Sequence, residues 1–229
     1  MLGNILITGG ASGLGRATAQ AVAKAGGRPL VVDVAPLAGD TETADFVRAD
    51  LADRAQAERA VHELAARAGG LDGVVTAAGI DACGPLADVP AGRWERVIAV
   101  NLLGTVSVVR AALPYLKESR GRVVTCASTL GVRAVSDATA YCASKFGVVG
   151  FTRALAAELA GEVGVTLLIP GGMHTRFFDD RDEKYKPAPD ARLNQPEDVA
   201  AAIVFALGQP PGCEVRELVV CPSTETSWP

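Results

Sequence analysis

Residues 4–15 read NILITGGASGLG, and this stretch decides the fold. Its first five residues form an apolar run of strand length, and the glycines after them permit a tight turn. Apolar side chains then recur at helical spacing, at Leu14, Ala17, Ala21 and Ala25. A strand, a glycine-rich turn and a helix in this order let a pyrophosphate rest on the helix N-terminus. The glycine spacing is G-x-x-x-G-x-G rather than the commoner G-x-G-x-x-G. The glycines alone are a weak signal, and the strand before them and the helix after them support the assignment.

The rest of the chain continues the same alternation of strand-length runs and helical stretches. This pattern predicts a doubly wound, seven-stranded parallel sheet of the Rossmann type with helices on both faces, an α/β fold. With 229 residues, we expect a single domain over residues 1–229. The expected strands are Asn4–Thr8, Pro29–Asp33, Phe46–Asp50, Gly73–Ala77, Arg122–Ala127, Val163–Ile169 and Glu217–Cys221.

Two further helices have clear start signals. Asp53 with Gln56 three residues later is a variant of the capping box. Pro196 followed by two acidic residues suits a first helical turn. The residues expected to face the core are Val61, Leu64, Ala65 and Ala68 in the first helix, and Val199, Ile203 and Leu207 in the second.

Arg176–Asn194 is the least regular segment, charged and interrupted by prolines. It follows a strand, so it should lie over the carboxyl edge of the sheet, where ligands bind in open α/β folds. We therefore expect a substrate lid over 176–194, with a plain solvent-exposed excursion as the alternative.

Composition narrows the possible environments. Apolar residues make up 49% of the chain and the formal charge is −4, with no basic run, which argues against a nucleic-acid surface. The start of the chain lacks the pattern of a signal peptide, and no uninterrupted apolar segment looks long enough to span a membrane. Five cysteines without a C-x-x-C pair suggest free thiols. We expect a cytoplasmic protein without a metal site.

Asp33 ends the second strand about 20 residues beyond the glycines. A carboxylate there accepts hydrogen bonds from an adenosine ribose and repels a 2′-phosphate, which favours NAD(H) over NADP. The alternative is an aspartate that merely starts a loop, and Arg16 directly after the glycines leaves NADP open. Asp50 is similarly placed to meet the adenine edge.

Tyr141 and Lys145 lie four residues apart in what reads as a long helix, so they share one helix face. A nearby ammonium favours the phenolate and lowers the pKa of a tyrosine, which makes the pair a plausible proton-transfer device. Taken alone, the pair is a common accidental arrangement, because most such pairs on helix surfaces merely face water.

Further landmarks fall in order along nearly the whole chain, from Gly3 to about Val220. They are Thr8 to Gly15, Asp50-Leu51, Ala78-Gly79, Val100-Asn101-Leu102-Leu103-Gly104, Ser128 thirteen positions before Tyr141, Lys145, and Pro170-Gly171-Gly172-Met173-His174-Thr175. In this ordered set the chain resembles the short-chain dehydrogenase/reductase family.

The resemblance implies a catalytic tetrad of Asn101, Ser128, Tyr141 and Lys145. Tyr141 would exchange a proton with the substrate oxygen, and Ser128 would donate a hydrogen bond to that oxygen. Lys145 would hold the cofactor ribose and lower the pKa of Tyr141, while Asn101 would position a water for proton relay. The alternatives are purely structural roles, in which Ser128 is a strand-end cap and Asn101 a helix-start residue.

The resemblance also implies a cofactor site, whose nicotinamide would be bordered by the segment from Pro170 to Thr175. The implied cofactor-binding residues are Gly9, Ser12, Gly13, Leu14, Gly15, Asp33, Asp50, Leu51, Ala78, Gly79, Tyr141, Lys145, Pro170, Gly171, Met173 and Thr175. We expect His174 to point away from the chemistry and His62 to be structural.

The chain departs from the family pattern in several places. Thr76 and Thr166 stand where asparagines that brace the sheet are usual, which puts local stabilisation in doubt. The short segment after Thr175 suggests an open pocket. The C-terminal tail, residues 222–229, does not match the usual glycine-rich ending, and we expect it to pack against a neighbouring subunit.

The sequence therefore predicts an NAD(H)-dependent oxidoreductase that interconverts a secondary alcohol and a ketone. The alternatives are a catalytically silent dinucleotide-binding regulator that senses redox state and, among enzymes, a 3-hydroxyacyl thioester or hydroxysteroid dehydrogenase. The expected partner is a small-molecule alcohol or ketone, with no nucleic acid and no membrane. Family members commonly form homotetramers or homodimers through the helix after Asn101 and the helix of Tyr141.

Overall fold

The structure, a computed structural model, describes residues 2–38 and 44–228. Its seven strands form one sheet in the order β3-β2-β1-β4-β5-β6-β7, with all neighbours parallel. The predicted fold class is confirmed. The strands are β1 (Asn4–Thr8), β2 (Arg28–Asp33), β3 (Asp45–Arg48), β4 (Gly73–Thr76), β5 (Arg122–Cys126), β6 (Gly164–Pro170) and β7 (Glu217–Val220).

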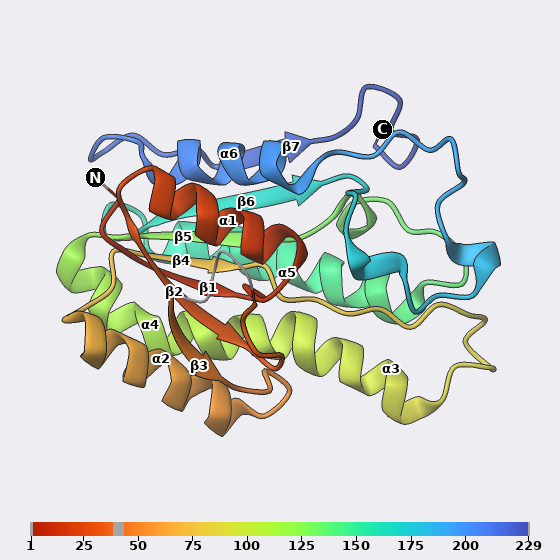
Figure 1. Cartoon of the computed structure of the whole chain (residues 1–229), viewed down its shortest axis with the longest axis horizontal. Helices are drawn as coiled ribbons and strands as arrows, with labels where there is room; N and C mark the ends of the chain where they lie inside the picture. The colour runs from red at the N-terminus through yellow and green to blue at the C-terminus, as the bar shows by residue number, and fades with distance from the viewer. Residues whose placement is uncertain (1, 39–43, 229) are drawn as a thin grey trace.

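Helices cover both faces of this sheet (Figure 1). One face packs against α1 (Gly13–Lys24) and α6 (Pro196–Leu207). The other packs against α2 (Arg54–Ala68), α4 (Thr105–Ser119) and α5 (Thr139–Glu158). The strand order reverses direction between β1 and β4, which is the switch point where ligands bind in open α/β sheets.

The expected helix signals operate as predicted at most positions. Asp53 caps α2 by accepting the Gln56 N–H at 3.1 Å, and the predicted inward residues of α6 are buried. Several strand ends are shifted by one residue, and two other differences are larger. Ala25 is exposed, because α1 ends at Lys24 and Gly26 takes a positive φ. β3 ends at Arg48 rather than Asp50, whose carboxylate turns the chain by accepting the Ala52 N–H.

One helical run continues from α3 (Ala91–Ile98) through a π-helical segment (Ala99–Gly104) into α4. By length and composition this run, Ala91–Ser119, could cross a membrane, although Asn101 and Arg110 interrupt its apolar residues. However, 56% of its most apolar window is buried inside the protein, as in the core helix of a compact domain.

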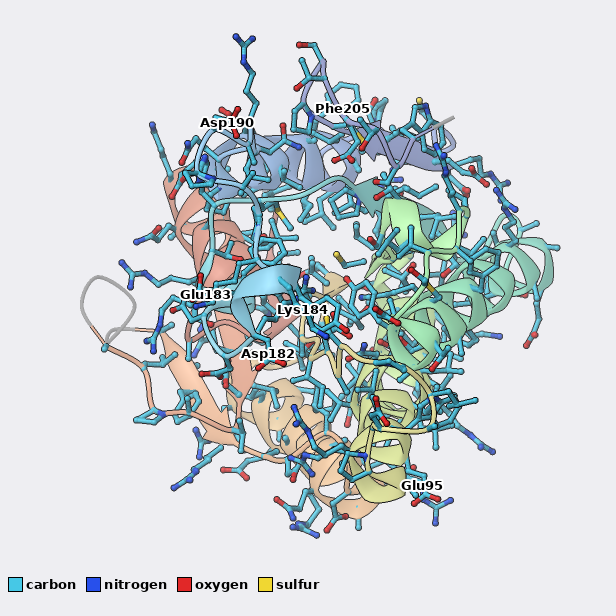
Figure 2. All side chains as sticks on the ribbon, turned by 90° about the vertical axis from the view of Figure 1, so that its right-hand side faces the viewer. Glu95, Asp182, Glu183, Lys184, Asp190 and Phe205 are labelled. Atoms are coloured by element: carbon cyan, nitrogen blue, oxygen red, sulfur yellow. The ribbon has the colours of Figure 1, made fainter. Side chains whose placement is uncertain are left out.

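The carboxyl ends of the strands point to the right in Figure 1, and Figure 2 looks directly onto this edge. The segment 176–194 lies over it, with 3₁₀ turns at Arg176–Phe178 and Glu183–Tyr185. Asp182, Glu183 and Lys184 stand near the centre of this view. The segment is therefore placed where a substrate lid is expected.

Candidate active site

The glycine loop between β1 and α1 has a shape that only glycine permits. Gly9 and Gly13 take φ values of +73° and +49°. A Cβ at Gly15 would overlap the carbonyl oxygen of Gly9, so the loop folds tightly onto the start of α1. A Cβ at Gly13 would come within 3.3 Å of Thr175, which places the loop beside the chain after β6. Ser12 is the exposed N-cap of α1, and Leu14 anchors its first turn in the core. This cradle fits a dinucleotide pyrophosphate.

Asp33 lies against the glycine loop at the end of β2. Its Oδ2 accepts the Ala11 N–H and its Oδ1 the Ala35 N–H, both at 2.9 Å. Arg16 is exposed on α1, while Arg48, in register with Asp33 on β3, donates to the carbonyl of Val34 at 2.8 Å. A carboxylate therefore faces the position expected for the adenosine ribose.

Asp50 is held by its own neighbours. Burial raises the pKa of this carboxyl, but hydrogen bonds from Ala52 and Arg96 and the charge of Arg96 outweigh burial and lower it. Arg96 lies 3.0 Å from Oδ2. Leu51 is buried, and a Cβ at Gly104 would come within 2.9 Å of it, so the π-helical segment approaches this loop closely.

Tyr141 and Lys145 share one face of α5, as predicted. The Lys145 Nζ lies 5.6 Å from the centroid of the Tyr141 ring and donates to the Cys126 carbonyl at 2.8 Å. The Lys145 side chain is almost fully buried, and this burial lowers its pKa. A Cβ at Gly79 would lie 3.6 Å from Nζ, so the chain after β4 passes directly beside the lysine.

The Tyr141 hydroxyl is kept protonated in the cofactor-free protein. Burial raises its pKa above the ordinary value and the nearby Cys126 thiol adds to this, while the Ser128 hydroxyl partly lowers it. The net direction is opposite to the lowering that the family resemblance implies for the working enzyme.

Ser128 follows β5, and its Oγ accepts the Leu130 N–H at 3.1 Å to cap the 3₁₀ turn at Thr129–Gly131. The predicted cap role is thus real. It is compatible with a catalytic one, because the same hydroxyl acts on Tyr141.

Asn101 lies in the π-helical segment, a form of helix that often marks functional sites. Its Oδ1 accepts the Ile80 N–H at 2.8 Å, and its Nδ2 donates to the Ile80 carbonyl at 2.9 Å and to Ser144 Oγ at 3.0 Å. The side-chain amide therefore ties the loop after β4 to α5. Its expected role in water relay stays a prediction.

The loop after β6 supplies the remaining segment of the candidate site. Gly171 donates to the Val220 carbonyl at 3.0 Å, and Met173 pairs with Asn194 in an isolated bridge. The Thr175 Oγ1 accepts the Phe177 N–H at 3.3 Å. His174 is exposed, and its expected orientation away from the chemistry stays a prediction. An open hollow of about 360 Å³ is lined by Met173, His174, Thr175, Arg176, Phe178, Asp179 and Leu193.

A family model described as short chain dehydrogenase matches residues 3–186, which is most of the chain and includes every element of this site up to the lid. The chain belongs to the short-chain dehydrogenase family. It is therefore an oxidoreductase whose family acts on CH–OH groups with a nicotinamide dinucleotide.

Named relatives of this dehydrogenase act on different compounds. The chain is 34% identical over 217 residues to a D-threitol dehydrogenase of Mycolicibacterium smegmatis, covering 87% of this chain and 84% of that protein. It is 32% identical over 216 residues to a 3-oxoacyl-[acyl-carrier-protein] reductase of Thermotoga maritima, covering 87% and 88%. Among solved structures, a 3-ketoacyl-(acyl-carrier-protein) reductase of Brucella melitensis complexed with NADH matches with a TM-score of 0.86, 29% identity and coverage of 97% and 99%.

In this dehydrogenase the segment 176–194 packs against Tyr141. The Phe177 ring packs on the Tyr141 ring, and the Arg181 guanidinium lies over the rings of Phe177 and Phe178. Arg181 also forms an ion pair with Asp81 at 2.6 Å, in which the two side chains are only 18% and 7% exposed. The hollow beside Thr175 is open, as expected from the short segment, but the Phe177 ring packs over Tyr141 itself.

Sequence reasoning missed Asp81 and Arg181. Asp81 comes two residues after Gly79, directly beyond a family landmark, and that position was the available signal. Burial and then the Asp81 carboxylate raise the pKa of the neighbouring Cys83 thiol to about 12. A thiol held in this way is packed rather than reactive.

The two threonines that replace the usual asparagines behave differently. Thr166 Oγ1 donates to the Val215 carbonyl at 2.6 Å. Thr76 Oγ1 is buried and has no hydrogen-bond partner. The predicted doubt about local stabilisation therefore applies to Thr76 alone.

Proposed function

We propose that this protein is an NAD(H)-dependent oxidoreductase that interconverts a secondary alcohol and a ketone, with Tyr141 as the acid/base. One observation carries the proposal. The buried Lys145 ammonium lies over the Tyr141 ring and the Ser128 hydroxyl bonds to its phenol, while the chain at Ala78–Gly79 connects Lys145 to a glycine loop shaped for a dinucleotide.

Each residue has a definite task in this scheme. The Tyr141 hydroxyl gives a proton to the substrate oxygen during reduction and takes it back during oxidation. Ser128 donates a hydrogen bond to the same oxygen and orients it. Lys145 holds the ribose hydroxyls of the dinucleotide, and Asn101 fixes the loop around Ile80 against α5. The bound nicotinamide supplies the site that accepts or donates hydride.

Asp33 supports NAD(H) over NADP(H). Its carboxylate is fixed by two backbone N–H groups at the edge of the glycine loop, where a 2′-phosphate would meet a negative charge. The relative whose structure is described as complexed with NADH fits the same preference.

The substrate end of the site favours a polar compound. Arg181 of the Asp81–Arg181 pair lies over Phe177, which packs on Tyr141, and the Cys83 thiol donates to Asp81. Polar groups close to Tyr141 suit a short polar alcohol better than a hydroxysteroid. The likeness to a D-threitol dehydrogenase points in the same direction, whereas the likeness to an acyl-thioester reductase keeps the 3-hydroxyacyl alternative open.

A substrate panel with NAD⁺ and NADH tests the function. Pure protein should bind NADH and show a change in nicotinamide absorbance with one or more of short polyols, simple ketones, 3-hydroxyacyl thioesters and hydroxysteroids. Tyr141→Phe should abolish turnover and leave NADH binding largely intact. Full activity in that variant would contradict the proposed role of Tyr141. NADH binding by the wild-type protein without turnover across the panel would favour the redox-sensing regulator instead.

We also propose a cytoplasmic homodimer or homotetramer that binds neither nucleic acid nor membrane. Leu103 and Phe146, on the two helical elements expected at the interface, are 56% and 44% exposed, which supports association there. Light scattering across a dilution series would show a monomer at all concentrations if this proposal is wrong.

A further inference from the structure

The C-terminal tail folds back onto its own chain instead of leaving the domain. It leaves β7 and turns between Pro222 and Glu225, where the Glu225 N–H donates to the Pro222 carbonyl at 2.9 Å. Arg133 then donates to the Thr226 carbonyl at 2.7 Å. In the structure the tail therefore lies at the carboxyl edge of the sheet, beside the site described above.

Glu225 makes the first contact between the tail and the site. Its Oε2 accepts the Gly172 N–H at 3.1 Å. The carboxylate sits so close that a Cβ at Gly171 would overlap Oε2, so the glycine at this position makes room for the acid. Gly171 and Gly172 belong to the segment that borders the nicotinamide in the proposed function.

Ser227 makes the second contact. Its hydroxyl is hydrogen-bonded to Glu225 Oε1 at 2.7 Å and to the Thr129 hydroxyl at 2.6 Å, and its N–H donates to the same Glu225 oxygen at 3.1 Å. Thr129 is buried and directly follows Ser128. The tail thus joins the residue after the substrate-binding serine to the loop after β6.

We infer that Glu225 and Ser227 are positioning residues of the dehydrogenase, which hold the Gly171–Gly172 loop and the Ser128–Thr129 turn at a fixed separation. This rests on the proposed function, because it assigns those two segments to the nicotinamide and the substrate oxygen. The tail is the bridge between them, linking the two through side chains that neither segment supplies.

The charge of Glu225 suits this role. Burial raises the pKa of the carboxyl, but hydrogen bonds from Ser227 and from the N–H groups of Gly172 and Thr226 outweigh burial and lower it. Glu225 therefore stays ionised, and an ionised acceptor forms stronger bonds to backbone N–H groups.

Binding of two ligands separates positioning from general stabilisation. ADP-ribose contains the adenosine and both phosphates but lacks the nicotinamide, so it reports on the glycine loop and Asp33 alone. Glu225→Ala should weaken NADH binding by about tenfold or more, the effect of losing one charge-assisted hydrogen bond, and leave ADP-ribose binding unchanged. Glu225→Gln keeps one acceptor oxygen and should fall between wild type and Glu225→Ala.

Ser227→Ala should lower kcat by about three- to tenfold with little change in ADP-ribose binding, because it releases Thr129 next to Ser128. Ser223→Ala is the matched control, since Ser223 is an exposed serine of the same tail. It should behave as wild type. Thermal unfolding of each variant confirms that the domain is folded during the measurements.

Two outcomes would overturn the inference. One is wild-type NADH affinity in Glu225→Ala together with wild-type kcat in Ser227→Ala. The other is a proportional loss of ADP-ribose and NADH binding, which indicates a general effect on the fold. If the wild-type protein binds ADP-ribose but not NADH, or catalyses nothing, the proposed function fails rather than the positioning role.

Discussion

Phe177 of the lid lies against Tyr141, with ring centroids 5.6 Å apart and ring planes inclined at 55°. The aromatic contact covers the residue assigned to proton transfer. The lid is held in this place by Arg181, whose guanidinium joins the Phe177 ring to the Asp81 carboxylate. A substrate must therefore move Phe177 or enter beside it.

Removing Arg181 should loosen the lid and destabilise the protein. Arg181→Ala leaves the Asp81 carboxylate buried without its partner, which we expect to cost about 1–3 kcal/mol, less than for a fully buried pair because Arg181 is partly exposed. Urea unfolding measures the loss, and limited proteolysis should cut faster within 176–194. Arg176→Ala is the control. Its pair with Asp179 is 87% and 57% exposed, so its loss should change stability by no more than about 0.5 kcal/mol. Equal effects would contradict a holding role for Arg181.

The pH dependence should follow the protonation of Tyr141. Because burial raises its pKa in the cofactor-free protein, its phenolate absorbance should appear above the ordinary tyrosine range of about pH 10. Comparison with Tyr141→Phe identifies the signal. The folded state favours the protonated phenol, so this contribution to stability is complete at low pH and is lost as the pH rises past about 10.

The pH dependence of catalysis should also report on the protonation of Tyr141, with opposite slopes for alcohol oxidation and ketone reduction. Alcohol oxidation needs the deprotonated tyrosine, so its kcat/KM should rise with pH, whereas ketone reduction needs the protonated form and should fall with pH. Binding of NAD⁺ should move the phenolate titration to lower pH if the cofactor charge assists Lys145. A titration that stays unchanged on NAD⁺ binding would argue against that assistance.

Asp33 should control the choice of cofactor. Asp33→Ala removes the charge that opposes a 2′-phosphate, so NADPH affinity should improve by about tenfold relative to NADH. Isothermal titration with both cofactors measures the change. Arg16→Ala serves as the comparison and should weaken NADPH alone if the exposed arginine assists the phosphate. A wild-type preference for NADPH would refute the assignment of Asp33.

Thr76 and Thr125 form a matched pair for a stability test. They are register partners on β4 and β5, and both are buried. Thr76 Oγ1 has no partner, so Thr76→Val should stabilise the protein by about 1 kcal/mol. Thr125 is hydrogen-bonded to Thr152 at 2.6 Å, so Thr125→Val should destabilise it by about 1 kcal/mol. Denaturant unfolding of both variants should give opposite signs.

The elements that sequence predicts best are those fixed by local patterns. Strands such as Asn4–Thr8 match to the residue because an apolar run ends abruptly in glycines. The Asp53 cap is also local, since both partners lie within one turn. The wrong prediction that Ala25 belongs to the apolar face of α1 also comes from a local pattern, because helix periodicity continues past the point where Gly26 stops the helix.

Local sequence patterns could not predict the contacts between residues that lie far apart in the sequence. The Asp81–Arg181 pair joins residues 100 positions apart, and no periodicity connects them. Glu225 was equally hidden, because its partner is a backbone N–H at Gly172 that becomes available only through the conformation of a distant loop. The contacts of the described part of the tail with its own chain were hidden in the same way, and its packing on a neighbouring subunit stays a prediction.

The π-helical segment at Ala99–Gly104 makes this part of the chain intolerant of length changes. A π-helix carries about one residue more than an α-helix over the same rise, so deletion of one residue there would restore regular α-helix. The helix before it would then rotate by about 100° relative to α4. Trp94 would leave its hydrogen bond to Thr139, and Asn101 would turn away from Ile80. Insertions and deletions should therefore be rare here and common in the exposed loops, which offers a criterion for aligning distant homologues.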